Sequence, residues 1–250
     1  MKIQCYGISN VGMKRSQNED SYLINDEIGL YMVADGMGGH LGGEFASKLA
    51  VTTVEELLSG FLDPEVTQIH GVNTEGSDVG DRLLHAIQEA GRRIHHESLY
   101  DEKLRGMGTT AVAVLFDNGK FYVAHVGDSR AYLLRESALQ QLTEDHSLVT
   151  EQVKAGMISA KDAKSHKLKN VITRSVGYQE EVEADLKVLE AQDGDRIMMC
   201  SDGLSNLVEH HEIQEIMKDL ELQEACEKLV KTANARGGDD NITVVMLEAG

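Results

Sequence analysis

The order in which strand-like and helical segments follow one another is the strongest constraint on the fold of this chain. Short apolar and β-branched runs at 21–25 and 30–34 precede two segments with helical spacing, at 44–60 and 78–100, and strand-like runs return from residue 109. Strands and helices therefore do not alternate as β-α-β units, and no Gly-x-Gly-x-x-Gly follows a strand. We predict an α+β fold in which antiparallel sheets have helices packed outside them.

The second half of the chain predicts a hairpin and further strands. Asn118-Gly119 separates apolar runs at 109–116 and 121–126, and Asn-Gly between two such runs is a strong hairpin signal. The segment 62–77, which contains the only proline of the chain, is expected to be a loop. Further strands are expected at 131–134, 186–189, 196–200 and 242–247, and a helix at 211–235.

The net charge limits the partners that this chain can have. It carries 24 basic and 42 acidic residues, a net charge of -18, which repels a phosphate backbone, so we expect no nucleic acid partner. No window approaches the roughly 18 apolar residues that span a bilayer, so we expect no membrane association. The first residues lack the apolar centre of a signal peptide, and we predict a cytoplasmic protein.

Acidic residues at the ends of apolar runs are the clearest candidates for chemistry. Asp35 and Asp202 each end such a run and precede glycine, Asp128 follows the run 121–126, and Asp240 comes shortly before a final strand. A single Asp-Gly is most often a turn. Several carboxylates gathered at sheet ends would repel one another without cations, and their oxygens suit Mg²⁺ or Mn²⁺. The set therefore favours a metal site.

A few basic side chains are further candidates. Arg15 lies shortly before Asp20, and it forms either a surface ion pair or a two-oxygen contact with a phosphate. His40 lies five residues beyond Asp35 in a glycine-rich stretch and is equally consistent with a structural role and with a place at the site. His125 lies inside a strand-like run and is interpreted as a buried core histidine, while His146 is a further candidate imidazole.

Together these residues fall into six motifs that occur in the order found in the metal-dependent PPM protein phosphatases, the protein phosphatase 2C type. The chain resembles the compact bacterial branch of this family from Ile3 to Leu247. The motifs are Arg15–Asp20, Ala34–His40, Met107–Thr110, Gly127–Arg130, Ser201–Leu204 and Asp240–Val244.

The resemblance implies one catalytic domain over residues 1–250, built as a four-layer αββα sandwich of two antiparallel sheets flanked by helix pairs, with a flap insertion. It also implies a binuclear Mn²⁺ or Mg²⁺ centre. Asp35 would bridge both ions, the Gly36 carbonyl would bind the second, and Asp202 and Asp240 would bind the first. Asp128, together with Asp202, would hold a third and weaker ion.

The resemblance also implies roles for three residues outside this ligand set. Arg15 would bind the substrate phosphate, and Asp20 would reach the metals through water. His40 is the candidate general acid. However, animal members have a histidine directly after the first Asp-Gly, where this chain has Met37, so the role of His40 stays open.

The implied activity is hydrolysis of phosphoserine and phosphothreonine on proteins by a metal-activated water, which reverses Ser/Thr kinase signalling. The expected partners are phosphorylated proteins, the substrates of a cognate Ser/Thr kinase, and a monomer is expected. The flap corresponds to about 146–176. Six basic residues face one acid between Lys154 and Arg174, and this local excess predicts attraction of phosphoproteins, with a solvated helical face as the alternative.

Competing interpretations have less support from the residues. The Cys-x5-Arg spacing of cysteine phosphatases fails at Cys5, Cys200 and Cys226. Around Ser129 no Ser-His-Asp order of a serine esterase is evident. The remaining alternative is a non-catalytic regulatory module of the same fold that binds metal or phosphoprotein. The complete set of acids together with Arg15 argues against it.

Overall fold

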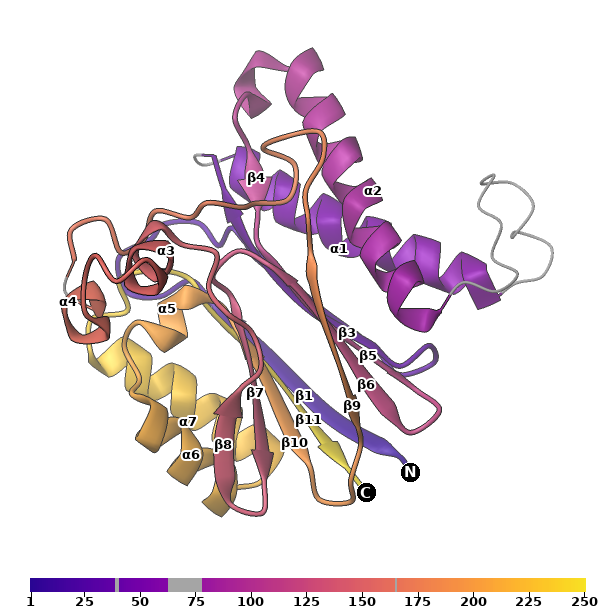
Figure 1. The fold of residues 1–250 in the computed structure, drawn as a ribbon, viewed down its shortest axis with the longest axis vertical. Coiled ribbons are helices and arrows are strands. Elements are labelled where there is room, and N and C mark those ends of the chain that lie inside the picture. The colour runs from indigo at the N-terminus through magenta and orange to yellow at the C-terminus, as the bar shows by residue number, and fades with distance from the viewer. Residues whose placement is uncertain (39–40, 63–77, 165) are drawn as a thin grey trace.

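Two antiparallel sheets stack face to face, and helices cover the outer face of each sheet (Figure 1). The computed structural model describes residues 1–38, 41–62, 78–164 and 166–250. The layer order of helices, sheet, sheet and helices confirms the predicted α+β sandwich. The predicted loop at 62–77 lies outside the described residues, apart from Leu62, which ends a helix.

Each sheet joins strands that lie far apart in the sequence, and all neighbouring strands are antiparallel. The first sheet has the order β1 (Ile3–Asn10), β11 (Ile242–Ala249), β10 (Arg196–Cys200), β7 (Arg130–Arg135) and β8 (Ala138–Gln141). The second has the order β2 (Asp20–Asn25), β3 (Leu30–Met37), β5 (Ala111–Asp117), β6 (Lys120–Val126) and β9 (Asp185–Glu190), and β4 (Gly108–Thr109) pairs with β3.

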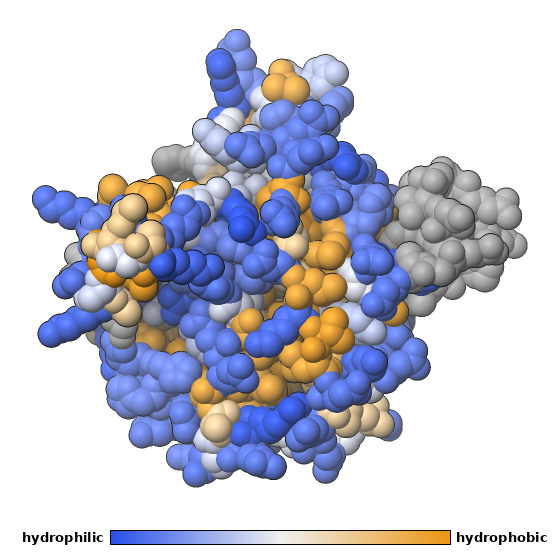
Figure 2. Space-filling view, viewed as in Figure 1, coloured by the Kyte–Doolittle hydropathy of each residue, from blue (hydrophilic) through white to orange (hydrophobic). Residues whose placement is uncertain are grey.

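The central strands are apolar at successive positions because both of their faces are buried. In β3, Leu30 and Met32 pack under the helices, whereas Tyr31 and Val33 point into the core between the sheets. Successive side chains of a strand point to opposite faces, so such a strand needs apolar residues throughout. The open edge of the sandwich lies between β8 and β9, where Figure 2 shows apolar side chains at the surface.

Two pairs of helices form the outer layers. Helices α1 (Gly42–Leu62) and α2 (Val79–Tyr100) pack on the second sheet, and α6 (His210–Asp219) and α7 (Leu222–Ala235) pack on the first (Figure 1). Each pair buries its apolar face on one sheet, as amphipathic helices do.

The single helix expected at 211–235 is wrong, because the chain breaks between α6 and α7. At the break Leu220 is extended, with φ -118° and ψ 154°. Arg196 of β10 donates to the carbonyl oxygens of Met217 and Leu220, both at 2.6 Å. This guanidinium satisfies carbonyls at the end of α6. The contact is tertiary, and no glycine or proline near the break predicts it from the sequence.

Residues 146–176 form an insertion between β8 and β9 that carries two short helices, α3 (Leu148–Lys154) and α4 (Ala160–Lys164). Figure 1 places both beside α5 (Asp202–Ser205), at one end of the sandwich. The same end receives the acidic termini of several strands. A 3-10 turn, η1 (Glu102–Leu104), follows α2. None of the helices among the described residues is long and apolar enough to span a membrane.

Candidate metal centre

Asp20 and Asp35 begin the site, because the antiparallel register of β2 and β3 places them directly opposite each other. The Oδ2 atom of Asp20 accepts hydrogen bonds from Ser201 Oγ at 2.8 Å and Thr243 Oγ1 at 2.6 Å. Its buried Oδ1 atom has no partner among the described residues. Burial raises the pKa of Asp20 to about 7 against the effect of these two hydrogen bonds. The site therefore contains a carboxylate that is only half satisfied by protein groups.

The backbone of Asp35 is held by the Met107–Thr110 motif. Its N–H donates to Thr110 Oγ1, and its carbonyl accepts from the Thr110 N–H and from Thr109 Oγ1, each at 2.9 Å. The next residue must be glycine, since a Cβ at Gly36 would lie 2.0 Å from the Gly43 carbonyl oxygen. The end of β3 is thus closely packed, and its backbone is held by hydrogen bonds on both sides of Asp35.

A cavity of about 300 Å³ brings the predicted residues together. The acids come from different elements: Asp35 lies near the end of β3, Asp128 follows β6, Asp202 begins α5 and Asp240 precedes β11. The residues of the predicted site that line this cavity are Arg15, Asp35, Gly36, Asp128, Asp202 and Asp240.

The acids of this cavity are strained electrostatically in the absence of a cation. Burial, followed by the charges of Asp20 and Asp202, raises the pKa of Asp35 well above its usual value. Burial, followed by Asp202, raises the pKa of Asp128 to about 7, and burial, followed by Asp240, raises that of Asp202 to about 6. Carboxylates that resist joint ionisation need protons or metal ions.

Arg15 lies at the mouth of the same cavity, with its side chain 52% exposed. Its Nη2 atom donates to Asp240 Oδ2 at 2.7 Å. The neighbouring Asp239 is exposed and pairs instead with Lys14. The structure therefore distinguishes the two adjacent acids, since only Asp240 lines the cavity.

Asn241 is a residue of this site that the sequence analysis missed as a functional position. Its Oδ1 accepts from the Glu19 N–H at 2.8 Å, and its Nδ2 donates to the carbonyls of Val11 and Gln17 at 3.0 and 2.9 Å. These bonds attach the loop that carries Arg15 to the strand entry that carries Asp240. The only sequence feature that could have indicated this role is the position of Asn241 directly after Asp240 in the last motif.

The candidate histidines have different outcomes. His40 lies outside the described residues, so its role stays a prediction. His125 is buried, as expected, and its Nε2 lies 2.8 Å from the Glu144 carbonyl oxygen. His146 stacks against it at 4.7 Å between ring centroids.

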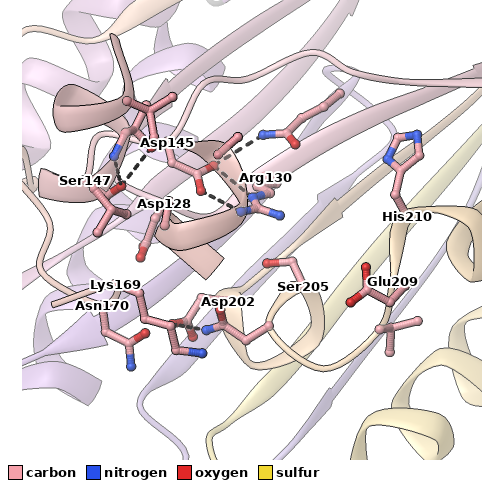
Figure 3. A pocket seen from close by; sticks show the side chains of 18 of the residues that line it. Asp128, Arg130, Asp145, Ser147, Lys169, Asn170, Asp202, Ser205, Glu209 and His210 are labelled. Carbon is pink, nitrogen blue, oxygen red and sulfur yellow. Dashed lines mark hydrogen bonds and ion pairs between the residues drawn. The ribbon is translucent and has the colours of Figure 1, made fainter. Parts of the chain in front are cut away.

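A second, larger cavity of about 490 Å³ lies between the 146–176 insertion and α5 (Figure 3). It shares Asp128, Asn170 and Asp202 with the first cavity, so the two are neighbours. Figure 3 shows Lys169 and Asn170 beside Asp202, opposite Arg130, which is bonded to Asp145 through two atoms at 2.8 and 2.6 Å. Two of the metal-binding candidates, Asp128 and Asp202, thus lie at the wall shared by a larger groove.

The donor set fits hard divalent cations. It consists of carboxylate oxygens, and this is the ligand chemistry that Mg²⁺ and Mn²⁺ prefer. The acids also raise one another's pKa values, which favours a bound cation because its positive charge would offset the repulsion between the carboxylates.

Known proteins resemble this chain over nearly its whole length. A family model for protein phosphatase 2C matches residues 13–244. The serine/threonine phosphatase stp of Listeria monocytogenes is 39% identical over 95% of this chain and 92% of that protein. The protein phosphatase PhpP of Streptococcus pneumoniae is 40% identical over 96% of this chain and 95% of that protein.

Solved structures agree with these relatives. The Mycobacterium tuberculosis serine/threonine phosphatase PstP/Ppp has a TM-score of 0.89 and 34% identity, and the match covers 100% of this chain and 99% of that one. The catalytic domain of PstP in complex with two manganese ions has a TM-score of 0.84 and 34% identity, over 98% and 97% of the two chains.

The sandwich and its acidic cavity define a metal-dependent hydrolase. The related sequences and solved structures specify which kind of hydrolase it is. This chain belongs to the protein phosphatase 2C family.

Proposed function

We propose that this chain removes phosphate from phosphoserine and phosphothreonine in proteins, as a metal-dependent protein phosphatase. The observation that carries the proposal is the cavity in which partly buried carboxylates with raised pKa values lie beside the Arg15 guanidinium. Relatives named serine/threonine phosphatase, and one solved with two manganese ions, support the same activity. A non-catalytic binding module is not favoured by these relatives.

The acids of the cavity divide into a core set and an accessory residue. Asp35 would bridge two ions. Asp202 and Asp240 would bind the first of these ions, and the carbonyl of Gly36 would bind the second. Asp128, which shares the cavity with Asp202, would hold a third and weaker ion. We propose Mn²⁺ or Mg²⁺ for all three positions, because the ligands are oxygen atoms.

Bound Mn²⁺ or Mg²⁺ would supply a water of low pKa that attacks phosphorus, and positive charge that stabilises the transferred phosphoryl group. Arg15 would exchange its bond to Asp240 for two oxygens of the substrate phosphate, since its guanidinium is half exposed and forked. Asp20 would accept a hydrogen bond from a water at its unpartnered Oδ1 and orient that water. His40, which lies outside the described residues, stays the candidate general acid.

The groove under residues 146–176 is the proposed place for the polypeptide of the substrate. It adjoins Asp128 and Asp202, and Lys169 lies in its wall. Phosphorylated proteins, made by a cognate Ser/Thr kinase, are the proposed partners. We further propose that the chain is one catalytic domain that acts in the cytoplasm as a monomer.

Metal removal tests the activity directly. The protein should release phosphate from a phosphothreonine peptide and from p-nitrophenyl phosphate, lose this turnover in EDTA, and regain it with added Mn²⁺. Peptide that binds without being hydrolysed at any Mn²⁺ concentration would instead support a binding module. Full turnover in metal-free buffer would contradict the mechanism.

A further inference from the structure

His146 holds the backbone that carries Asp128. Its Nδ1 atom accepts a hydrogen bond from the Gly127 N–H at 3.1 Å, and its backbone N–H donates to the Gly127 carbonyl at 2.9 Å. Gly127 has a φ of +101°, a conformation that other residues rarely adopt. The turn that presents Asp128 is therefore fixed from both sides by one buried histidine.

The other side of the imidazole faces an ion pair. The Nε2 atom of His146 lies 3.5 Å from Asp185 Oδ2, and Arg174 Nη1 donates to Asp185 Oδ1 at 2.9 Å. Arg174 Nη1 also lies 3.4 Å from His146 Nε2, farther than from Asp185. Because Nδ1 accepts the Gly127 hydrogen bond, we assign the proton of the neutral ring to Nε2, directed to Asp185, and the Arg174 hydrogen bond to Asp185. Burial, followed by the neighbouring His125, lowers the pKa of His146, which is consistent with a neutral ring.

The same residue closes the base of the insertion. The Thr173 N–H donates to the His146 carbonyl at 2.8 Å, and the Leu148 N–H donates to the Val171 carbonyl at 2.8 Å. The segments that enter and leave residues 146–176 are thus paired next to the turn that carries Asp128. Arg174, in the departing segment, completes the contact through Asp185.

A metal ion is the competing explanation for these side chains. Among the described residues, His125, His146 and Asp185 offer ligand atoms within 4.8 Å of one another. A cation on Nε2 would require the proton on Nδ1, where the Gly127 N–H already points. In addition, Arg174 already neutralises Asp185. The hydrogen bonds therefore favour a positioning role over a further metal site.

We propose that His146 is a positioning residue that joins the base of the 146–176 insertion to the Asp128 carboxylate, and so sets the affinity of the weaker ion. This inference rests on the proposed role of Asp128 as a ligand of that ion. It assigns no direct contact between His146 and substrate or metal.

Two substitutions separate the two faces of the imidazole. An asparagine can place its Oδ1 near the position of Nδ1 and keep the bond from Gly127, whereas a glutamine places its amide nitrogen near Nε2 and keeps only the Asp185 side. We expect His146→Gln to weaken the Asp128-dependent Mn²⁺ site by about tenfold, the size of an outer-shell effect, and to leave the tighter sites unchanged in calorimetry. His146→Asn should stay within about threefold of the wild type.

Hydrogen exchange supplies a readout that is independent of metal and activity. The Gly127 amide should exchange faster in His146→Gln than in His146→Asn, and ¹⁵N shifts of the wild-type ring in Mg²⁺ buffer should show the Nε2–H tautomer. An Nδ1–H tautomer in the wild type, or equal Mn²⁺ binding and equal Gly127 exchange in both variants, would overturn the proposal. If Asp128→Asn leaves the Mn²⁺ titration unchanged, the assigned role of Asp128 fails instead.

Discussion

At the scale of single residues, the chemistry of this protein depends on carboxylates that are hard to ionise together. Asp35 and Asp128 both have pKa values raised by burial and by neighbouring acids, yet they occupy different places in the site. Asp35 lies opposite Asp20 in the register of β2 and β3. Asp128 lies on the turn before β7, next to the larger groove. Their substitutions should therefore have different effects.

We expect Asp35→Ala to lose tight binding of both core ions and to lower kcat by at least about a hundredfold, the usual result of removing central charge stabilisation. Asp128→Ala should keep the two tight ions and lower kcat by about tenfold. Calorimetry with Mn²⁺ and phosphate release measure both effects. Asp193→Ala, which removes an exposed acid outside the site, is the control. Wild-type Mn²⁺ affinity in Asp35→Ala would show that this residue does not bridge the ions.

At the scale of elements, the basic insertion is less positive than its composition predicts. Lys154 pairs with Glu144 at 2.8 Å, and Arg174 pairs with Asp185 at 2.9 Å. In the part of the chain that the structure describes, Lys161, Lys167 and Lys169 are exposed and form no ion pair. Figure 2 shows hydrophilic side chains projecting from the region of α3 and α4. Among the described side chains of the insertion, these three lysines are the charges left to attract a substrate.

Changing Lys161, Lys167 and Lys169 together to Gln should lower kcat/KM for a phosphoprotein by about three- to tenfold at low salt, because steering by charge accelerates association. The loss should shrink as salt rises, since the Debye length is about 8 Å at physiological salt. Hydrolysis of p-nitrophenyl phosphate should change less than that of the phosphoprotein, because of the three lysines only Lys169 lies beside Asp202.

The matched control removes the same charge elsewhere, by changing Lys218, Lys228 and Lys231, all exposed on α6 and α7. This control should behave as the wild type toward both substrates. Equal losses in the two triple variants would assign the effect to net charge and remove the steering role of the insertion.

At the scale of the whole molecule, the acidic cavity couples folding to pH. Asp20, Asp128 and Asp202 have an ordinary pKa of 3.8, which the metal-free fold raises to about 7, 7 and 6. Between pH 3.8 and these raised pKa values, the folded chain binds more protons than the unfolded chain. The three acids therefore contribute most to stability below pH 3.8, and this contribution is lost as pH rises through their pKa values in the folded chain. The net charge of -18 acts in the same direction.

In EDTA we therefore expect the unfolding free energy to fall by at least about 2 kcal/mol between pH 5 and pH 8, measured by urea denaturation. Saturating Mn²⁺ should reduce this dependence, since cations replace the protons. His146 has a lowered pKa and opposes the trend only below its ordinary value of 6.5. Stability that rises with pH in EDTA would contradict the burial of these acids.

The succession of strands and helices along the chain, the hairpin and the position of the acids near strand ends follow from local pattern, and these predictions agree with the structure. The break between α6 and α7 does not, because Arg196 reaches it from a strand of the sheet. The short strand β8 was also missed, since a four-residue edge strand has little periodicity. The local sequence pattern therefore predicts only those helices and strands that bury a regular apolar face.

The sequence by itself determined the class of the fold and the residue types of a divalent-cation site, because strand periodicity and acids beside glycine are local properties of the chain. Only the tertiary structure decided which acids share a cavity, how Asn241 joins two distant loops, and how His146 contacts both Gly127 and Asp185. Each of these depends on contacts between segments far apart in the chain. Such contacts form only when the two sheets pack, and no spacing along the sequence records them.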